Sequence, residues 1–155
     1  MAETPFITLR AANPHDVAFL MELRRTSMWR VVTNHYPWIE ADQLERVLLH
    51  FESSRIICSD GRDIGLFKVV YGTNQVQLCQ IQLLPEFQGR GIGSMLISQL
   101  MKEVGSSVLS ITLNVLRSNP AANLYARLGF RIFAEDRNSL IMLWHSTEAF
   151  QTPHN

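Results

Sequence analysis

The sequence predicts one α/β domain built around a mixed, mostly antiparallel sheet. Three strand-like apolar segments follow one another with only short turns between them, and such neighbours pair antiparallel. Strand-like and helix-like segments then alternate in the second half of the chain, and helical crossovers allow parallel pairs. The length of 155 residues suits one domain with a substantial core. We expect the domain to span residues 1–146, followed by a C-terminal tail of residues 147–155.

The first third of the chain is predicted to hold one strand and two helices. Phe6–Arg10 is a short strand-like segment, and Asn13 followed by Pro14 is typical of a helix start. Apolar residues then recur at helical spacing to about Val32. After Thr33–Glu40, a second helix is predicted, whose apolar face would consist of Leu44, Val47, Leu48 and Phe51.

Three strands and a helix are predicted next. Turn signals at Asp60-Gly61 and at Gly72–Asn74 separate the strands. The helix covers about Gly91–Val104, where apolar residues form one stripe. The three strands are about Arg55–Ser59, Ile64–Tyr71 and Val76–Leu84.

The last third of the chain is predicted to complete the sheet. A fifth strand covers Val108–Leu116, and Asn119 with the following proline begins a short helix that ends at Gly129. The last two strands are Phe130–Glu135 and Leu140–Trp144.

Composition excludes several classes of protein. Apolar residues make up 46% of the chain, charged residues 18%, and the formal net charge is zero, so we expect neither nucleic acid nor an anionic membrane as partner. The chain has no apolar run of membrane-spanning length and no signal-like start. Cys58 and Cys79 lack metal-ligand spacing and are expected to be buried free thiols in the cytoplasm.

A glycine-rich stretch lies between the fourth strand and the following helix. Gln88–Gly93 carries glycines at positions 89, 91 and 93. A helix start offers unpaired N–H groups and the positive end of the helix dipole, and glycines let a phosphate oxygen approach them without meeting a Cβ atom. Arg90 would add positive charge and the Ser94 hydroxyl a further donor. The stretch therefore predicts an anion site.

Four interpretations of this stretch compete. A Walker A loop requires a lysine, which is missing here. A Rossmann fingerprint requires G-x-G-x-x-G after the first strand of a βαβ unit, whereas these glycines have G-x-G-x-G spacing after a fourth strand. An acyl-CoA loop has the pattern Q/R-x-x-G-x-G/A, which Gln88–Gly93 satisfies at every fixed position. Taken alone, the glycines also fit a tight turn without a ligand.

Two motifs together make the chain resemble the GNAT family of N-acetyltransferases over about Gln75–Phe133. Directly ahead of the glycine stretch, Ile81–Glu86 is similar to the family's fourth strand and its exit. Ser118–Phe130 is similar to the family's second signature, which ends in L-Y-x-x-x-G-F. The resemblance implies a GNAT-like fold with helices on both faces of the sheet. It also implies that strands four and five splay apart around the pantetheine arm of acetyl-CoA.

The resemblance also implies residues that bind the cofactor. The main chain of Ile81, Gln82 and Leu83 would pair with the pantetheine amides. The amide of Asn119 would contact the CoA arm, although a plain helix N-cap fits this residue equally well. The pyrophosphate would be held by the backbone of Gln88, Gly89, Arg90, Gly91, Ile92, Gly93 and Ser94.

Tyr125 matches the tyrosine that this family places near the CoA sulfur. As general acid it would donate a proton to the departing thiolate, because a phenol with a pKa near 10 is protonated at neutral pH. The alternative is a residue packed on the sheet, on one helix face with Ala121. The N–H of Leu83 would polarise the thioester carbonyl.

The general base is harder to identify. An alkylammonium of pKa near 10 is about one part in a thousand neutral at pH 7. His35 is the tentative base by pKa, with Glu40 behind it, while a solvated loop histidine is the alternative; His145 ranks lower. Where family members often have a glutamate, the strands carry amides, which hold a water or an acceptor but take no proton: Gln75, Gln77, Gln80, Gln82 and Asn114. Among them, Gln80 and Asn114 are tentative substrate-binding residues.

Several aromatic residues lie close to His35 in the sequence. Trp29, Tyr36 and Trp38 fall in or beside the segment that covers the acceptor site in this family. Such aromatic density is usual in a core, but here it would line an acceptor pocket. These three residues and His35 are therefore tentative substrate-binding residues.

We predict an acyl-CoA-dependent N-acyltransferase that moves an acetyl group from acetyl-CoA to a primary amine by direct attack, without a metal. A small molecule or a peptide would supply the amine. The protein would be cytoplasmic and a monomer or homodimer. The alternative is an acyl-CoA-binding sensor that lacks the base, and a general nucleotide-binding domain is disfavoured by the glycine spacing.

Overall fold

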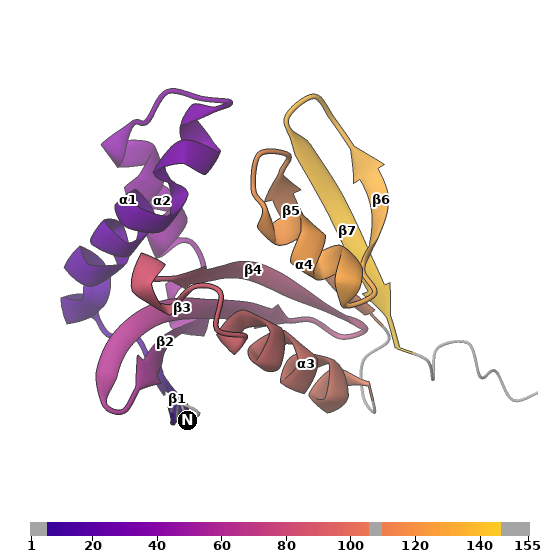
Figure 1. The fold of residues 1–155 in the computed structure, drawn as a ribbon, viewed down its shortest axis with the longest axis horizontal. Helices are drawn as coiled ribbons and strands as arrows, with labels where there is room; N and C mark the ends of the chain where they lie inside the picture. Colours follow the sequence, from indigo (N-terminus) through magenta and orange to yellow (C-terminus); the bar gives the residue numbers. More distant parts are fainter. Residues whose placement is uncertain (1–5, 106–109, 147–155) are drawn as a thin grey trace, which may run out of the picture. The chain divides into compact units, whose positions relative to one another are not determined.

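A seven-stranded mixed sheet organises the computed structural model, which describes residues 6–105 and 110–146. Its strand order is β1-β2-β3-β4-β5-β7-β6 (Figure 1). β4 and β5 are parallel, whereas the pairs β1–β2, β2–β3, β5–β7 and β6–β7 are antiparallel. This confirms the predicted fold class. With η for 3₁₀ helices, the elements are β1 (Ile7–Ala11), η1 (Pro14–Asp16), α1 (Val17–Thr33), α2 (Glu40–Leu48), η2 (Phe51–Ser53), β2 (Ser54–Ser59), β3 (Arg62–Tyr71), β4 (Gln75–Leu83), η3 (Pro85–Phe87), α3 (Ile92–Val104), β5 (Ser110–Leu116), α4 (Ala121–Arg127), β6 (Arg131–Glu135) and β7 (Ser139–His145).

The chain divides into two compact units. Of the described residues, unit 1 contains 6–69 and 80–92, and unit 2 contains 70–79, 93–105 and 110–146. Strands β3 and β4 contribute residues to both units. The glycine-rich stretch passes from unit 1 to unit 2 between Ile92 and Gly93.

Unit 1 packs the helices α1 and α2 on the antiparallel strands β2 and β3. Burial of each aliphatic side chain in such a core contributes about 1.5–3 kcal/mol. The face of α1 that packs on these strands explains the apolar periodicity from which α1 was predicted. The core residues come from all four elements and are Leu20, Leu23, Val47, Ile56, Cys58 and Leu66.

Lys68 of β3 caps the last turn of α2 from inside unit 1. Its side chain is almost fully buried. Its Nζ donates hydrogen bonds to the main-chain carbonyls of Arg46, Val47 and Leu49 at 3.2, 3.0 and 2.7 Å. The last carbonyls of a helix lack partners within the helix, so the ammonium satisfies them and complements the negative end of the helix dipole.

The buried face of α2 differs from the predicted one. Gln43 and Val47 are buried, whereas Leu44 and Leu48 are 37% and 49% exposed. Phe51 lies beyond the helix in η2. Gln43 is buried because its side-chain oxygen accepts a hydrogen bond from the buried Arg24, a contact that apolar periodicity does not reveal.

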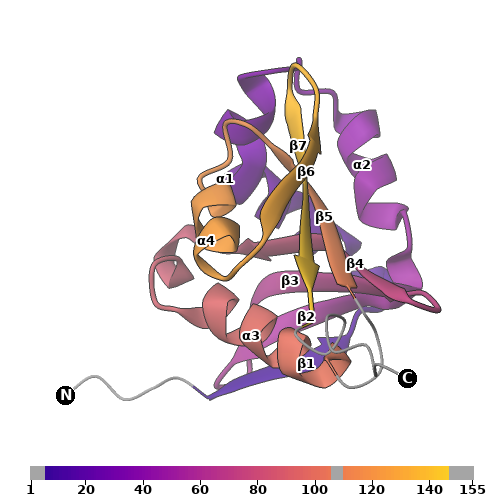
Figure 2. The same ribbon diagram turned by 90° about the vertical axis from the view of Figure 1, so that its right-hand side faces the viewer.

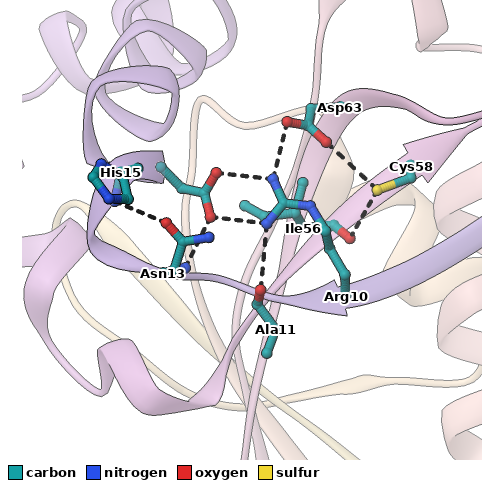
Figure 3. A network of polar contacts seen from close by, with 8 residues as sticks. Arg10, Ala11, Asn13, His15, Ile56, Cys58 and Asp63 are labelled. Carbon is teal, nitrogen blue, oxygen red and sulfur yellow. Dashed lines mark hydrogen bonds and ion pairs between the residues drawn. The ribbon is translucent and has the colours of Figure 1, made fainter.

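A polar network around Arg10 joins β1 to the start of α1 (Figure 3). The guanidinium donates to both carboxylate oxygens of Asp16 at 2.9 and 2.8 Å and to Asp63 at 2.9 Å. Asp16 also accepts from the N–H of Asn13, whose side chain in turn accepts from the N–H of His15. This is a capping box, which confirms the predicted helix start.

Unit 2 contains the antiparallel strands β5, β7 and β6 and the helix α4 (Figure 2). Pairing of β5 with β7 runs from Ser110 opposite His145 to Leu116 opposite Ser139. Helix α4 is followed by Gly129, which has a φ of +104° and marks the predicted helix end.

The parallel ladder between β4 and β5 is short. It consists of three pairs, from Gln75 opposite Ser110 to Gln77 opposite Thr112, although β4 continues to Leu83. A short ladder is what splayed strands four and five require, since parallel strands that diverge stop exchanging hydrogen bonds.

The remaining sequence predictions concern ends and thiols. The predicted start of the fifth strand at Val108 and the tail of residues 147–155 lie outside the described residues. Neither cysteine forms a disulfide with a described residue, but only Cys58 is buried; Cys79 is partly exposed, contrary to prediction. Within residues 6–105 and 110–146, no helix is both long and apolar enough to cross a membrane. Across the same residues, no three His, Cys, Asp or Glu side chains gather as a metal site would require.

Candidate functional site

The exit of β4 forms a turn that is fixed by Gln88. The Gln88 side chain donates a hydrogen bond of 2.9 Å to the main-chain carbonyl of Leu83, and its own N–H donates to the carbonyl of Pro85. The single 3₁₀ turn η3 lies between these contacts. The backbone of Gln88 stays a predicted contact of the pyrophosphate, and its side chain shapes the turn from which the glycine stretch continues.

Two glycines of the stretch have backbone conformations that disfavour side chains. Gly89 has a φ of +74° and Gly91 a φ of +80°. A Cβ atom built on either residue meets nothing within 4 Å, so the space beside both is open. Packing against the protein therefore does not explain these glycines. An open left-handed turn ahead of a helix fits an anion that approaches the backbone.

Positive charge gathers beside this turn. Arg90 is exposed, and its guanidinium lies 5.2 Å from the ring centroid of Phe87. Arg62 lies 5.3 Å from the same centroid and also pairs with Glu86 at 2.6 Å. Because cations are attracted to an aromatic face, Phe87 holds two guanidinium groups close to the glycine stretch.

Main-chain N–H and C=O groups at the end of β4 alternately point toward β3 and away from it. The N–H of Leu84 donates to the carbonyl of Ile64 on β3, and a Cβ on Gly65 would overlap the carbonyl oxygen of Gln82. Main-chain groups alternate along a strand, so those of Ile81 and Leu83 point away from β3. These two residues thus have the orientation that pairing with an extended ligand needs.

The aromatic residues near the end of α1 and in the segment before α2 do not belong to the core. The rings of Trp29 and Trp38 lie 4.9 Å apart, and those of His35 and Tyr36 lie 6.2 Å apart. Trp29 and Tyr36 are 48% and 44% exposed. Unit 1 thus brings the four predicted acceptor residues into two aromatic pairs that remain partly open to solvent.

Glu40 is already engaged by another residue. Its two carboxylate oxygens accept from Nε and NH2 of Arg25 at 2.9 and 3.0 Å. This pairing lowers the pKa of Glu40. A carboxylate with a lowered pKa is a weaker base, so the structure argues against Glu40 as a reserve general base.

Gln80 and Asn114, the two polar strand residues predicted to bind the substrate, lie in different environments. Gln80 donates to the main-chain carbonyl of Arg46 at 3.1 Å, and its side-chain oxygen is buried without a partner. Asn114 is exposed on β5 in unit 2, opposite Ile141 in the register. Gln80 therefore has an unfilled hydrogen-bonding position inside unit 1, whereas Asn114 faces solvent.

Tyr125 lies in unit 2 on α4. It is 6% exposed, and its ring lies 5.8 Å from that of Phe130. Burial raises the pKa of the Tyr125 phenol to about 12. The hydroxyl therefore stays protonated throughout the ordinary pH range, as a proton donor must, although it is a weaker acid than a solvated phenol.

Asn119 and Ser94 also lie in unit 2. The side-chain oxygen of Asn119 accepts from the N–H of Ala121, the first residue of α4, at 3.0 Å, although the residue at the N-cap position is Pro120. The role of Asn119 toward CoA stays a prediction. Ser94 is partly buried in the first turn of α3.

Sequence reasoning missed Arg24. This residue is buried in α1 and donates from Nε to Gln43 at 2.9 Å. The signal was present, because Arg24 follows the buried Leu20 by four residues and therefore lies on the same face of the helix. A basic residue on an apolar face is uncommon without a partner or a function.

Comparisons with known proteins agree with this geometry. A family model described as an acetyltransferase (GNAT) domain matches residues 52–132. The structure is similar to PaiA N-acetyltransferase from Thermoplasma acidophilum in complex with coenzyme A, at 23% identity and a TM-score of 0.73, covering 90% of this chain and 99% of that one.

Two further solved structures share the fold. The ribosomal-protein-S18-alanine N-acetyltransferase from Escherichia coli has 19% identity and a TM-score of 0.69, covering 97% of this chain and 100% of that one. The spermidine N-acetyltransferase from Vibrio cholerae, in complex with CoA and spermine, has 24% identity and a TM-score of 0.64, covering 92% and 97%. No curated protein matches the sequence. The family model spans more than half of the chain, and so the chain belongs to the GNAT acetyltransferase family.

Proposed function

We propose that this protein is an N-acetyltransferase that moves the acetyl group of acetyl-CoA to a primary amine by direct attack. The observation that carries the proposal is the turn at Gly89–Gly91, where two left-handed glycines leave open space ahead of α3 in a chain of the GNAT family. Two solved structures of similar fold contain coenzyme A. Acetyl-CoA is the acyl donor in this proposal.

The residues around the turn fit the chemical groups of CoA. Backbone N–H groups of the glycine stretch suit the pyrophosphate, and Arg90 adds positive charge beside it. The main-chain groups of Ile81 and the N–H of Leu83, which point away from β3, suit the pantetheine arm, whereas the Leu83 carbonyl already accepts from Gln88. In unit 2, Ser94 and Asn119 are proposed as further contacts.

Acyl transfer forms a C–N bond as the C–S bond breaks, and the electron pair leaves with the sulfur. The thiolate then takes a proton. Tyr125 is proposed to donate it, because burial keeps its phenol protonated. The N–H of Leu83 is proposed to polarise the thioester carbonyl.

The amine must lose a proton to attack. With Glu40 held by Arg25, deprotonation is proposed to come from ordered water, from His35, or from an acceptor of low pKa. An α-amine of pKa near 8 is about a tenth neutral at pH 7, roughly a hundred times more than a lysine-like amine. Acceptors with α-amines are therefore favoured.

The test is an amine screen that follows thiol release from acetyl-CoA. Amine-dependent release, with the acetylated amine identified by mass spectrometry, supports the transferase. A protein that binds acetyl-CoA in calorimetry but transfers to no amine in a panel of amino acids, polyamines, aminoglycosides and peptides is instead an acyl-CoA sensor. The engaged state of Glu40 is the observation that keeps this second function in view.

A further inference from the structure

A buried guanidinium in unit 1 has no acidic partner among residues 6–105 and 110–146. Arg24 is 3% exposed. Its one hydrogen bond with the described residues runs from Nε to the neutral side chain of Gln43. The neighbouring Arg46 adds a second positive charge, and burial together with this neighbour lowers the pKa of Arg24 to about 10, so the group remains charged at neutral pH.

Such a group is costly in a folded protein. A buried charge is normally paired with an opposite charge, because removing it from water is expensive. A guanidinium has five N–H donors in a planar fork that matches a carboxylate, and here only one of the five is used within the described residues. The two terminal nitrogens of Arg24 thus make no hydrogen bond with the described residues.

Hydrogen-bond acceptors without partners lie in the same unit. The side-chain oxygens of Gln80 and Gln82 are buried and accept no hydrogen bond from the part of the chain that the structure describes. Because the two residues are two apart on β4, they share one face of the strand. Buried amide oxygens usually have a partner, so two neighbouring exceptions require an explanation.

The contacts of α2 bring these donors and acceptors together. Gln80 reaches the main-chain carbonyl of Arg46, and Gln43, the partner of Arg24, precedes Arg46 by three residues. Residues three apart on a helix are neighbours, about 5–6 Å between Cβ atoms. Arg24, through Gln43, and the side chain of Gln80, through the Arg46 carbonyl, therefore contact α2 within one helical turn.

We infer that the amine acceptor of this protein carries a carboxylate, which Arg24 binds. An amine N–H of the same molecule would donate to the side-chain oxygens of Gln80 and Gln82. Donors at one end of the polar cluster and acceptors at the other complement a molecule with both groups, as in amino acids and peptides. A polyamine would instead add positive charge next to Arg24 and Arg46. The inference rests on the proposed transferase function and narrows its acceptor class.

The first test compares each acceptor acid with its C-terminal amide, and kcat/KM is calculated on the concentration of free amine, because replacing the carboxylate by an amide also lowers the pKa of the amine. The wild-type protein and acetyl-CoA are assayed with glycine, L-alanine, β-alanine, γ-aminobutyrate and L-alanyl-L-alanine, each beside its C-terminal amide. We expect kcat/KM to be about 10- to 100-fold higher for the acid in at least one pair, the range of a charge-assisted hydrogen-bonded pair. The free amino acids and the dipeptide distinguish a small molecule from a peptide chain end. Equal rates for acid and amide in every pair overturn the inference while leaving the transferase function in place.

The second test uses two adjacent arginines. Arg24→Met keeps much of the buried volume but removes the charge, and Arg24→Lys keeps the charge but loses the fork. Arg25→Met is the control for removing a cation from the same helix, and because it also releases Glu40, its acid-to-amide ratio rather than its absolute rate is compared with that of wild type. We expect Arg24→Met to lower kcat/KM for the acid 10- to 100-fold, to affect the amide much less, and to leave the Kd for CoA unchanged. Arg24→Lys should fall between Arg24→Met and wild type.

A binding measurement distinguishes a failure of the proposed transferase function from a failure of the carboxylate site. Thermal unfolding is followed with each acid and amide in the absence of CoA, for wild type and Arg25→Met. Stabilisation by an acid but not by its amide supports the carboxylate site even if no amine is acetylated. If no amine is acetylated and no acid stabilises wild type, both the function and the inference fail. If acetylation proceeds but Arg24→Met lowers acid and amide rates equally, Arg24 only supports the fold and the inference is overturned.

Discussion

The side-chain amide of Gln88 donates a hydrogen bond of 2.9 Å to the main-chain carbonyl of Leu83. This contact joins the last residue of β4 to the first residue of the glycine-rich stretch, across η3. It fixes the turn before any ligand binds. The anion site we propose is therefore built partly by the side chain of Gln88, a residue whose backbone alone the sequence analysis assigned to the ligand.

Replacing Gln88 should weaken CoA binding by loosening this turn. Gln88→Leu removes one exposed hydrogen bond worth about 1 kcal/mol. We expect a roughly fivefold rise in the Kd for CoA in calorimetry, with little change in Tm. Gln99→Leu, on the exposed side of α3, is the control and should bind CoA as wild type does. An unchanged Kd in Gln88→Leu would show that the turn does not depend on this bond.

Gly91 and Gly61 allow backbone strain to be separated from ligand contact. Both have a φ near +80°, and a Cβ on either meets nothing within 4 Å. Alanine at either position should cost about 1–2 kcal/mol of unfolding free energy, because the left-handed conformation is unfavourable for it. Only Gly91→Ala should lose CoA affinity, by about tenfold or more. Similar CoA affinities in the two variants would show that the phosphate of CoA does not bind at this turn.

Tyr125→Phe should lower kcat by about 10- to 100-fold with little change in the Kd for CoA. Because burial raises the pKa of Tyr125 to about 12, the wild-type rate should not decline from loss of this proton at any pH up to about 10. Tyr71→Phe, at an exposed tyrosine, is the control. A variant Tyr125→Phe with wild-type kcat would leave Tyr125 with a packing role only.

The proposed lack of a dedicated carboxylate base predicts a rising pH profile. For a lysine-like acceptor, kcat/KM should climb above pH 8 in step with the fraction of free amine. His35→Gln should leave that rise in place if water takes the proton, and should depress the rate near pH 7 if the imidazole does. His15→Gln is the control, because His15 is exposed at the start of α1. A profile that is flat from pH 6 to 9 would indicate an efficient base elsewhere.

The stability of unit 1 should depend on Asp16 in a pH-dependent way. The hydrogen bond from Arg10 lowers the pKa of Asp16 below its ordinary value of 3.8. A carboxylate with a lowered folded-state pKa stabilises the protein above about pH 4, and this stabilisation is lost as the pH falls through the folded-state pKa. Asp16→Asn should therefore lower the unfolding free energy by about 1–3 kcal/mol at pH 7.

Urea unfolding at pH 7 and at pH 3 measures this effect. The difference between wild type and Asp16→Asn should shrink at the lower pH, because below the ordinary pKa of 3.8 the unfolded chain binds the proton that the folded carboxylate resists. Asp60→Asn is the control, because Asp60 is exposed and asparagine tolerates its left-handed φ of +50°. A difference that is equal at the two pH values would mean that the Asp16 charge contributes nothing.

Local signals in the sequence were sufficient for the elements and the motifs. Apolar periodicity placed α1 and the strands, and the capping box at Asn13 and the glycine at 129 marked helix ends. The glycine stretch and the segment Ser118–Phe130 indicated the family that the family model confirms. Each of these signals depends on residues a few positions apart, whose geometry the backbone itself fixes.

Tertiary structure alone decided which polar residues meet. Arg24 pairs with Gln43, Arg25 holds Glu40, and Lys68 caps α2. These partners lie 15 to 21 residues apart in the sequence, so their contact depends on how α1, α2 and β3 pack. For this reason the sequence identified Tyr125 and the glycine stretch, whereas the engaged Glu40 and the buried cation at Arg24 emerged only once the helices of unit 1 were packed on their strands.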